Sequence, residues 1–348
     1  MPGVMNVVGA RPQFVKAGPV SRALAASGLV EILVHTGQHY DRLMSDAIMA
    51  DVGLRDPDYN LGVGSGSHGV QTGLMLQAIE SLILDTGPDV VLTYGDTNST
   101  IAAALAAAKL HVPTAHVEAG LRSFNRAMPE ELNRVATDHL SDLLFAPTDL
   151  AMSNLSKEGL EERAILTGDV MVDALHAIDL ESLELPDWSG APFYAATIHR
   201  PSNTDDPERI AGIIEALGTL DAPVHLMAHP RLKGQLEGFN IELPDSVIVD
   251  APLPYATMLG VVKASQGLIT DSGGLQKEAF ILGVPCTTVR DETEWPETLE
   301  GGWNVLAGSD LAKLAELVVR KTESDRANPF GSGNAASEIV AQLMKHID

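Results

Sequence analysis

The chain has 348 residues, and its 45% hydrophobic and 20% charged residues are typical of a soluble globular protein. At roughly 100 to 200 residues per domain, this length favours two domains. The 23 basic and 47 acidic residues give a net charge of −24 and a pI of about 4.7. This charge disfavours nucleic acids and anionic membrane surfaces as partners, so an anionic ligand needs local Arg, His and helix N-termini.

Short β-branched runs alternate with helical segments along the chain. The runs of the first half cover residues 4–8, 31–35, 90–94, 114–117, 143–146 and 164–167. After a break with Pro and Trp at 185–192, the second half has runs at 194–198, 224–228, 247–249, 267–270 and 287–289. This alternation predicts an α/β fold with two Rossmann-like, doubly wound domains.

The domain boundaries follow from the same pattern. We expect residues 1–170 and a final helix within 333–348 to form the first domain, and residues 185–330 to form the second. Polar clusters follow many of the predicted strands, and ligands of such sheets bind outside the carboxyl ends of the strands. We therefore expect the two domains to face one another across a shared cleft.

The single cysteine, Cys286, cannot form an internal disulfide and is predicted to be a small buried hydrophobe. No basic segment followed by an apolar run opens the sequence, and no run approaches the roughly 18 apolar residues of a membrane span. We expect a cytoplasmic protein without a membrane partner.

A predicted strand at 267–270 runs into Asp-Ser-Gly-Gly-Leu-Gln-Lys-Glu, residues 271–278. Free backbone N–H groups at the following helix start, at Gly273 and Gly274, and the Ser272 hydroxyl suit a diphosphate. Glu278, further along the helix, suits the two hydroxyls of a ribose. An ordinary turn with an N-cap explains the same pattern without a ligand.

Arg11 follows the first strand in GARPQF, with Pro12 at a candidate first helical position. A cation is unfavourable beside a helix N-terminus, so this conflict suggests an anion held between Arg11 and the helix end.

Three carboxylates follow strand ends or begin helices: Asp96, Glu118 and Glu130. Clustered acids raise one another's pKa, so a group of three near one cleft indicates proton transfer. Glu131 offers an alternative helix-start role beside Glu130.

No candidate cofactor motif is supported by the residues around it. Residues 64–69 match G-x-G-x-x-G, but no buried strand precedes them, and a loop is the better interpretation. No metal-ligand spacing is present, so we expect neither a metal nor a nicotinamide.

The segments GARPQF, TGQH, YGDTNST, HVEAGLRSFNRAMPEELNR, TIHR and TDSGGLQKEA together resemble the non-hydrolysing UDP-N-acetylglucosamine 2-epimerase family. The resemblance spans residues 9–336. It implies two Rossmann-like domains arranged as in GT-B glycosyltransferases, with the last helix returning to the first domain. It also implies that UDP is eliminated to give a 2-acetamidoglucal and is then added back, without a cofactor.

The resemblance implies a role for each matching residue. Asp96, Glu118 and Glu130 match the catalytic acids, and Arg11 and His199 match residues that hold the diphosphate, His199 serving the reaction as well. Ser272, Gly273 and Gly274 belong to the motif that binds the phosphates, and Glu278 matches the ribose ligand. We expect a UDP-sugar as substrate, a homodimer and a place in polysaccharide biosynthesis.

At two places the sequence differs from that of many family members, and both differences concern regulation. TGQH continues as Tyr40-Asp41, and TIHR continues as Pro201-Ser-Asn203, unlike many relatives. Some bacterial members bind a second UDP-N-acetylglucosamine as activator through the TGQH segment, so the departures disfavour such activation here.

Other functions stay open. The segments above, with TEWPE at 293–297, also resemble the branch acting on UDP-2,3-diacetamido-2,3-dideoxy-glucuronate, whose carboxylate Arg122 or Arg126 would pair. A GT-B glycosyltransferase and a nucleotide-sugar sensor are further alternatives. UDP-N-acetylglucosamine is the first choice.

Overall fold

The computed structural model describes residues 3–38 and 48–347. The chain forms two compact units, the first running to residue 178 and resuming at 328, and the second spanning 179–327. The chain therefore leaves the first unit a few residues later than the sequence pattern indicates, and it returns a few residues earlier. Each unit contains one parallel sheet.

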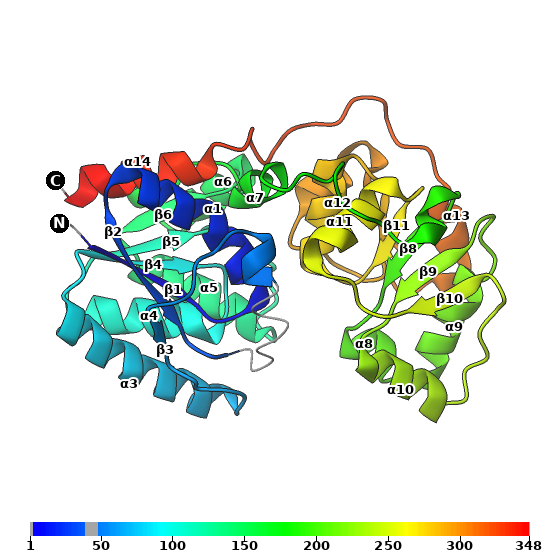
Figure 1. Ribbon diagram of the computed structural model, residues 1–348, viewed down its shortest axis with the longest axis horizontal. Helices are drawn as coiled ribbons and strands as arrows, with labels where there is room; N and C mark the ends of the chain where they lie inside the picture. Colours follow the sequence, from blue (N-terminus) through cyan, green and yellow to red (C-terminus); the bar gives the residue numbers. More distant parts are fainter. Residues whose placement is uncertain (1–2, 39–47, 348) are drawn as a thin grey trace. The chain divides into compact units, whose positions relative to one another are not determined.

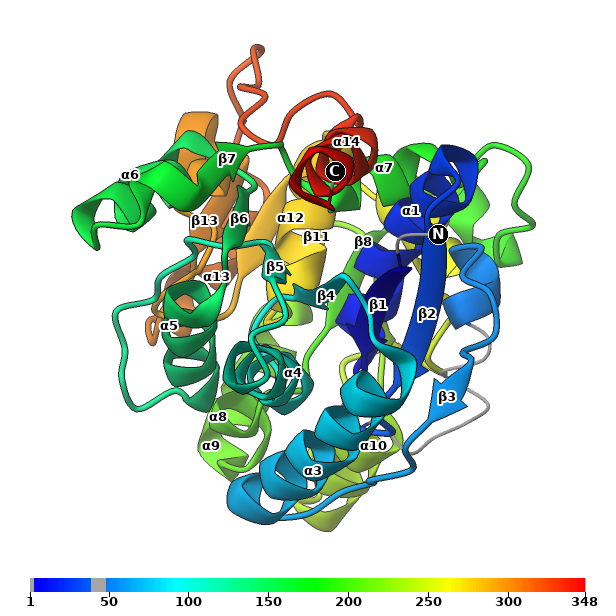
Figure 2. The ribbon, with the colours of Figure 1, turned by 90° about the vertical axis from the view of Figure 1, so that its left-hand side faces the viewer.

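The sheet of the first unit has the strand order β3-β2-β1-β4-β5-β6-β7, which Figure 2 shows. Every strand pair in it is parallel. The strands are β1 (Gly3–Val8), β2 (Val30–His35), β3 (Tyr59–Asn60), β4 (Val90–Tyr94), β5 (Thr114–Val117), β6 (Leu143–Ala146) and β7 (Ala164–Leu166).

Helices pack against this sheet because most of them bury one apolar side. They are α1 (Arg11–Ser27), α3 (His68–Thr86), α4 (Asn98–Lys109), α5 (Pro129–Leu140), α6 (Asp149–Lys157), α7 (Val170–His176) and α14 (Ala335–Ile347), with a 3₁₀ turn at Glu161–Arg163. The final helix, α14, lies beside α1 and α7 (Figures 1 and 2). Asp173 of α7 accepts hydrogen bonds from the amides of Ala335 and Ala336 and so caps α14.

The sheet of the second unit has the order β10-β9-β8-β11-β12-β13, and all its pairs are parallel. The strands are β8 (Tyr194–Thr197), β9 (Val224–Met227), β10 (Val247–Asp250), β11 (Leu268–Thr270), β12 (Cys286–Thr288) and β13 (Asn304–Leu306). The helices are α8 (Pro201–Thr204), α9 (Pro207–Leu217), α10 (Pro230–Gly238), α11 (Tyr255–Ala264), α12 (Gly273–Leu282) and α13 (Leu314–Val318). Three 3₁₀ turns cover Asp187–Gly190, Pro296–Gly302 and Leu311–Lys313.

In each sheet, the direction in which the chain adds strands reverses once. The chain winds outward from β1 to β3 and then returns to add β4 on the other side of β1. In the second unit, β8 and β11 have the same relation. Ligands of open α/β sheets bind outside the strand ends at such a switch point. The residues that follow β1, β4, β8 and β11 are therefore the first places to look for a site.

The sequence pattern predicted the α/β class and the strands of both sheets, apart from β3 and β13. The helix beginning after Ser272 is confirmed, whereas α1 begins at Arg11 with Pro12 in second position. Cys286 is buried as predicted, and burial raises the pKa of its thiol to about 12. Within the described ranges, no helix combines the length and apolar character needed to cross a membrane.

Candidate active site

The turn after β1 is joined to the end of β4 through Gln13. Its Oε1 accepts hydrogen bonds from the amides of Gly9 (2.8 Å) and Ala10 (3.0 Å), and its Nε2 donates to the Tyr94 carbonyl (2.9 Å). A Cβ atom at Gly9 would overlap neighbouring hydroxyl groups, so this close approach requires glycine. The turn holds the half-buried Arg11 at the first position of α1, beside the switch point.

Glu118 follows β5 in a left-handed conformation, with φ of 71°, which is uncommon for a residue with a side chain. Its amide donates to the Phe145 carbonyl at 3.1 Å, which helps to hold that conformation. Its carboxylate forms a buried ion pair with Lys16 of α1. Backbone strain of this kind concentrates at functional positions. Glu118 was predicted from the sequence, whereas Lys16 was not.

Asp96 follows β4 and forms an ion pair with Arg134 of α5. Burial raises the pKa of Asp96, and the nearby Glu118 charge raises it further, while Arg134 and Lys16 act in the opposite direction. Glu118, in contrast, is paired with Lys16. The two carboxylates therefore have different charged partners, Arg134 for Asp96 and Lys16 for Glu118.

Glu130 and Glu131 begin the same helix but have different surroundings. Glu130 is exposed on the first turn of α5, and no hydrogen bond or ion pair among the described residues joins it to the other two acids. Glu131 is buried, and it accepts hydrogen bonds from the Ser123 amide (2.9 Å), the Ser123 hydroxyl (3.0 Å) and the Phe124 amide (2.9 Å). Glu131 therefore closes the loop that precedes α5 and leaves Glu130 accessible.

Arg122 and Arg126 differ in the same way. Arg122 is buried and forms a bidentate pair with Glu158, at 2.7 and 2.8 Å, and a second ion pair with Asp138 at 2.7 Å. Its guanidinium also donates to the Leu121 carbonyl. These partners fit a role for Arg122 in ordering the loop before α5, and its pairing with a substrate carboxylate stays a hypothesis. Arg126 is exposed in the loop before α5.

In the second unit, Asp271 organises the end of β8. It is completely buried, and its carboxylate accepts from the amides of His199 and Arg200 and from the Asn203 side chain. His199 Nδ1 lies 2.7 Å from its Oδ1, while the imidazole is 53% exposed. Burial alone would raise the pKa of Asp271, but contacts led by the His199 hydrogen bond lower it. Asp271 thus holds His199 by one nitrogen and leaves the other for a ligand.

Ser272, directly after Asp271, caps α12, and Gly273 and Gly274 form its first turn. The first amides of a helix have no intrahelical acceptors and point towards an approaching anion. Glu294, paired bidentately with Arg290 at 2.9 Å, lies beside Gly273. Its negative charge is therefore balanced locally.

Glu278 lies further along α12 and is 4% exposed. Its Oε1 accepts a hydrogen bond from the Tyr255 hydroxyl of α11 at 2.8 Å. This contact fixes the direction of the carboxylate. The structure thus brings His199, Ser272, Gly273 and Gly274 together around Asp271, with Glu278 on the same helix.

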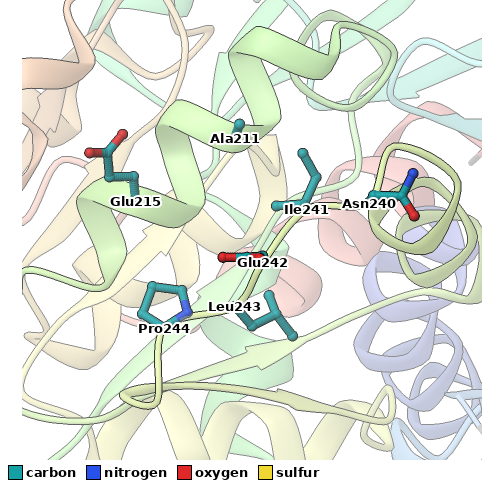
Figure 3. A pocket seen from close by; sticks show the side chains of 7 residues that line it. All are labelled: Ala211, Glu215, Asn240, Ile241, Glu242, Leu243 and Pro244. Carbon is teal, nitrogen blue, oxygen red and sulfur yellow. The ribbon is translucent and has the colours of Figure 1, made fainter.

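A shallow groove of about 500 Å³ lies elsewhere in the second unit (Figure 3). It is lined by Ala211 and Glu215 of α9 and by residues 240–244, which precede β10. The groove therefore lies towards the amino ends of the strands. It contains two of the chain's carboxylates, Glu215 and Glu242, and none of the predicted site residues.

No three His, Cys, Asp or Glu side chains in the described part of the chain are grouped to hold a metal ion. The contacts that sequence reasoning missed are those of Lys16, Arg134, His116, Asp138 and Asp271. Lys16 could have been recognised from the sequence, because a lysine on a mostly apolar helix face is rarely buried without a partner. Asp271 stood in a quoted motif without an assigned role.

Comparison with known proteins identifies the family of the chain. The family model described as UDP-N-acetylglucosamine 2-epimerase matches residues 22–344. The chain belongs to this family. It is an isomerase by class, and the resemblance carried by the six sequence segments is confirmed.

Named family members include enzymes for two sugars. The chain is 47% identical to the UDP-2,3-diacetamido-2,3-dideoxy-D-glucuronate 2-epimerase of Pseudomonas aeruginosa, over 98% of this chain and 99% of the relative. The crystal structure of Methanocaldococcus jannaschii UDP-GlcNAc 2-epimerase with UDP-GlcNAc and UDP matches with a TM-score of 0.89 and 40% identity, covering 99% of each chain. A calicheamicin glycosyltransferase shares the fold alone, with a TM-score of 0.60 at 18% identity.

Proposed function

We propose that this enzyme interconverts UDP-N-acetylglucosamine and its C2 epimer, UDP-N-acetylmannosamine. The observation that carries the proposal is the pair of carboxylates, Asp96 and Glu118, held in different environments by Arg134 and Lys16 at the switch point of the first sheet. Loss of a weakly acidic C2 proton requires a placed base, and its return on the other face requires a placed acid.

The reaction has two halves that balance. A base removes the C2 proton while the bond between C1 and the UDP oxygen breaks, which leaves a 2-acetamidoglucal and UDP. UDP then adds back to C1 while a proton is delivered to the opposite face of C2. We assign these proton transfers to Asp96, Glu118 and Glu130.

The nucleotide contacts are assigned mainly to the second unit. His199 and the amides of Gly273 and Gly274, with the Ser272 hydroxyl, would bind the diphosphate, and Glu278 would bind the ribose. Arg11 of the first unit adds a cation for the leaving phosphate. Positive charge and helix amides stabilise the negative charge that develops on departing UDP. No step in this scheme requires a metal or a nicotinamide.

Proton NMR of the purified enzyme with UDP-N-acetylglucosamine in deuterated water tests the function directly. We expect deuterium at C2 and the appearance of the second epimer, with rates unchanged by a chelator. A glycosyltransferase would leave C2 protonated and would release UDP only while transferring the sugar to an acceptor or to water, and a sensor would leave the UDP-sugar intact. Either result, or activity restored only by a divalent ion, contradicts the proposal.

A second candidate substrate is UDP-2,3-diacetamido-2,3-dideoxy-glucuronate. The 47% identity to the Pseudomonas aeruginosa enzyme named for that sugar favours it. Because Arg122 is occupied by Glu158 and Asp138, Arg126 is the arginine of this loop left to meet a sugar carboxylate. The two sugars are distinguished by that charge.

We expect Arg126→Ala to change the preference between the two sugars if Arg126 pairs the carboxylate. A charge-assisted pair contributes about 1.5 to 3 kcal/mol, so kcat/KM for the acidic sugar should fall roughly 10- to 100-fold relative to the neutral one. Lys109→Ala is the matched control. This exposed cation lies at the end of α4, towards the amino ends of the strands and not at their carboxyl ends. An unchanged ratio of the two kcat/KM values excludes the specificity role.

Three further assignments are part of the proposal. We assign the enzyme to the cytoplasm, as a homodimer, in the supply of sugars for polysaccharide biosynthesis. The expectation that a second UDP-sugar does not activate this enzyme concerns in part Tyr40 and Asp41, which lie outside the described residues. Light scattering at several protein concentrations measures the oligomeric state.

A further inference from the structure

A buried histidine lies behind the peptide that carries Asp96. His116 of β5 has no exposed surface, and its Nε2 lies 2.7 Å from the carbonyl oxygen of Gly95. A carbonyl oxygen only accepts, so Nε2 donates to it. The Gly95 amide in turn donates to the Val117 carbonyl at 3.0 Å. The Gly95 backbone, directly before Asp96, is thus held by β5 on both sides.

The other nitrogen of His116 is held by Asp138 of α5. Nδ1 lies 2.7 Å from Asp138 Oδ1, and Asp138 is also fully buried. Asp138 Oδ2 accepts from the Gly120 amide at 3.1 Å and pairs with Arg122 at 2.7 Å. Burial raises the pKa of Asp138, but the His116 hydrogen bond and the charges of His116 and Arg122 lower it overall. Asp138 is therefore the ionised centre of the cluster.

These contacts connect the three segments that carry the candidate acids. Through His116, Asp138 holds the peptide before Asp96, and through the Gly120 amide it holds the turn that contains Glu118. Asp138 belongs to α5, the helix on which Glu130 lies. Neither His116 nor Asp138 has exposed surface, so neither contacts a substrate.

We propose that His116 and Asp138 are positioning residues that set the three candidate acids relative to one another. This inference rests on the proposed function. Because the pair acts through the backbone, we expect it to affect the geometry of proton transfer. Nucleotide binding, which is assigned mainly to the second unit, should not depend on it. A misplacement of about 1 Å at a reacting group costs on the order of 100-fold in rate.

The test is His116→Gln, measured as kcat, KM, UDP affinity and melting temperature. We expect kcat to fall roughly 10- to 100-fold. KM and the affinity for UDP should stay within about threefold, the split expected when only the transition state is affected. Asp138→Asn is the second variant and should show the same split, so the proposal is decided even if one of the two fails to fold.

The chain offers a matched control in the second unit. His225, 4% exposed, forms a similar pair with Asp250 at 2.8 Å and stacks on Trp188. His225→Gln should lower the melting temperature and leave kcat near that of the unaltered enzyme. Equal loss of kcat in both histidine variants, or unchanged kcat in folded His116→Gln, overturns the proposal. Turnover by the unaltered enzyme is measured first, so failure of the proposed function is seen separately.

Discussion

Replacing Glu118 by Gln, or Asp96 by Asn, is expected to lower turnover by at least about 100-fold, the scale of general acid–base catalysis. Each change keeps the size of the side chain and removes its ability to exchange a proton. Glu118→Gln also leaves Lys16 without its partner at this buried pair. UDP binding should survive in both variants, because their nucleotide contacts lie mainly in the second unit. Turnover is measured as kcat, and UDP binding is measured by calorimetric titration.

Glu130→Gln is expected to show a similar loss, and its neighbour provides the control. Glu131→Gln weakens the acceptor of three hydrogen bonds in the preceding loop, so it should lower the free energy of unfolding by about 1.5 to 3 kcal/mol. Turnover near that of the unaltered enzyme in Asp96→Asn, Glu118→Gln and Glu130→Gln together would show that these acids do not perform the chemistry.

The two strands that the sequence failed to predict, β3 and β13, are short strands at sheet edges. β3 has two residues, Tyr59–Asn60, both exposed, and β13 has three, Asn304–Leu306. Local patterns carry little information about so few residues at a sheet edge, where pairing depends on the neighbouring strand. The longer buried strands, such as β1 and β4, were predictable because burial on both faces requires continuous apolar runs.

The individual acids were predictable, whereas their partners were not. Asp96 and Glu118 follow strands, so their place at the carboxyl edge of the sheet follows from the alternation alone. The pairing of His116 with Asp138 spans 22 residues, and that of Lys16 with Glu118 spans 102. Such contacts depend on how helices pack over the sheet, which the spacing of residues along the chain does not determine.

Asp271→Asn is expected to weaken UDP binding by about 10- to 100-fold. The charged carboxylate organises the amides of His199 and Arg200, and its contact with Nδ1 directs the imidazole. Hydrogen bonds to charged groups contribute about 1.5 to 3 kcal/mol each, and an amide in this position keeps an acceptor without the charge. The dissociation constant for UDP, measured by calorimetry, should rise while the secondary structure stays unchanged.

The loss of stability in Asp271→Asn, relative to the unaltered enzyme, should depend on pH in a defined direction. Because the pKa of Asp271 is lowered in the folded protein, its charge contributes stability that is present above the ordinary Asp pKa near 4. That contribution is lost as the pH falls through the lower folded value. The difference in free energy of unfolding between the unaltered enzyme and Asp271→Asn should therefore be largest near pH 7 and should shrink on acidification below about pH 4.

Asp250→Asn is the matched control for this prediction. It removes the same charge from a second His–Asp pair of this unit, between His225 and Asp250 at 2.8 Å, without touching the end of β8. It should lower stability and leave the dissociation constant for UDP within about threefold, because affinity depends on how His199 is directed and not on the stability of the unit as a whole. Equal weakening of UDP binding by both variants would mean that Asp271 supports the unit in general, and His199 would lose its assignment as a diphosphate ligand directed by that carboxylate.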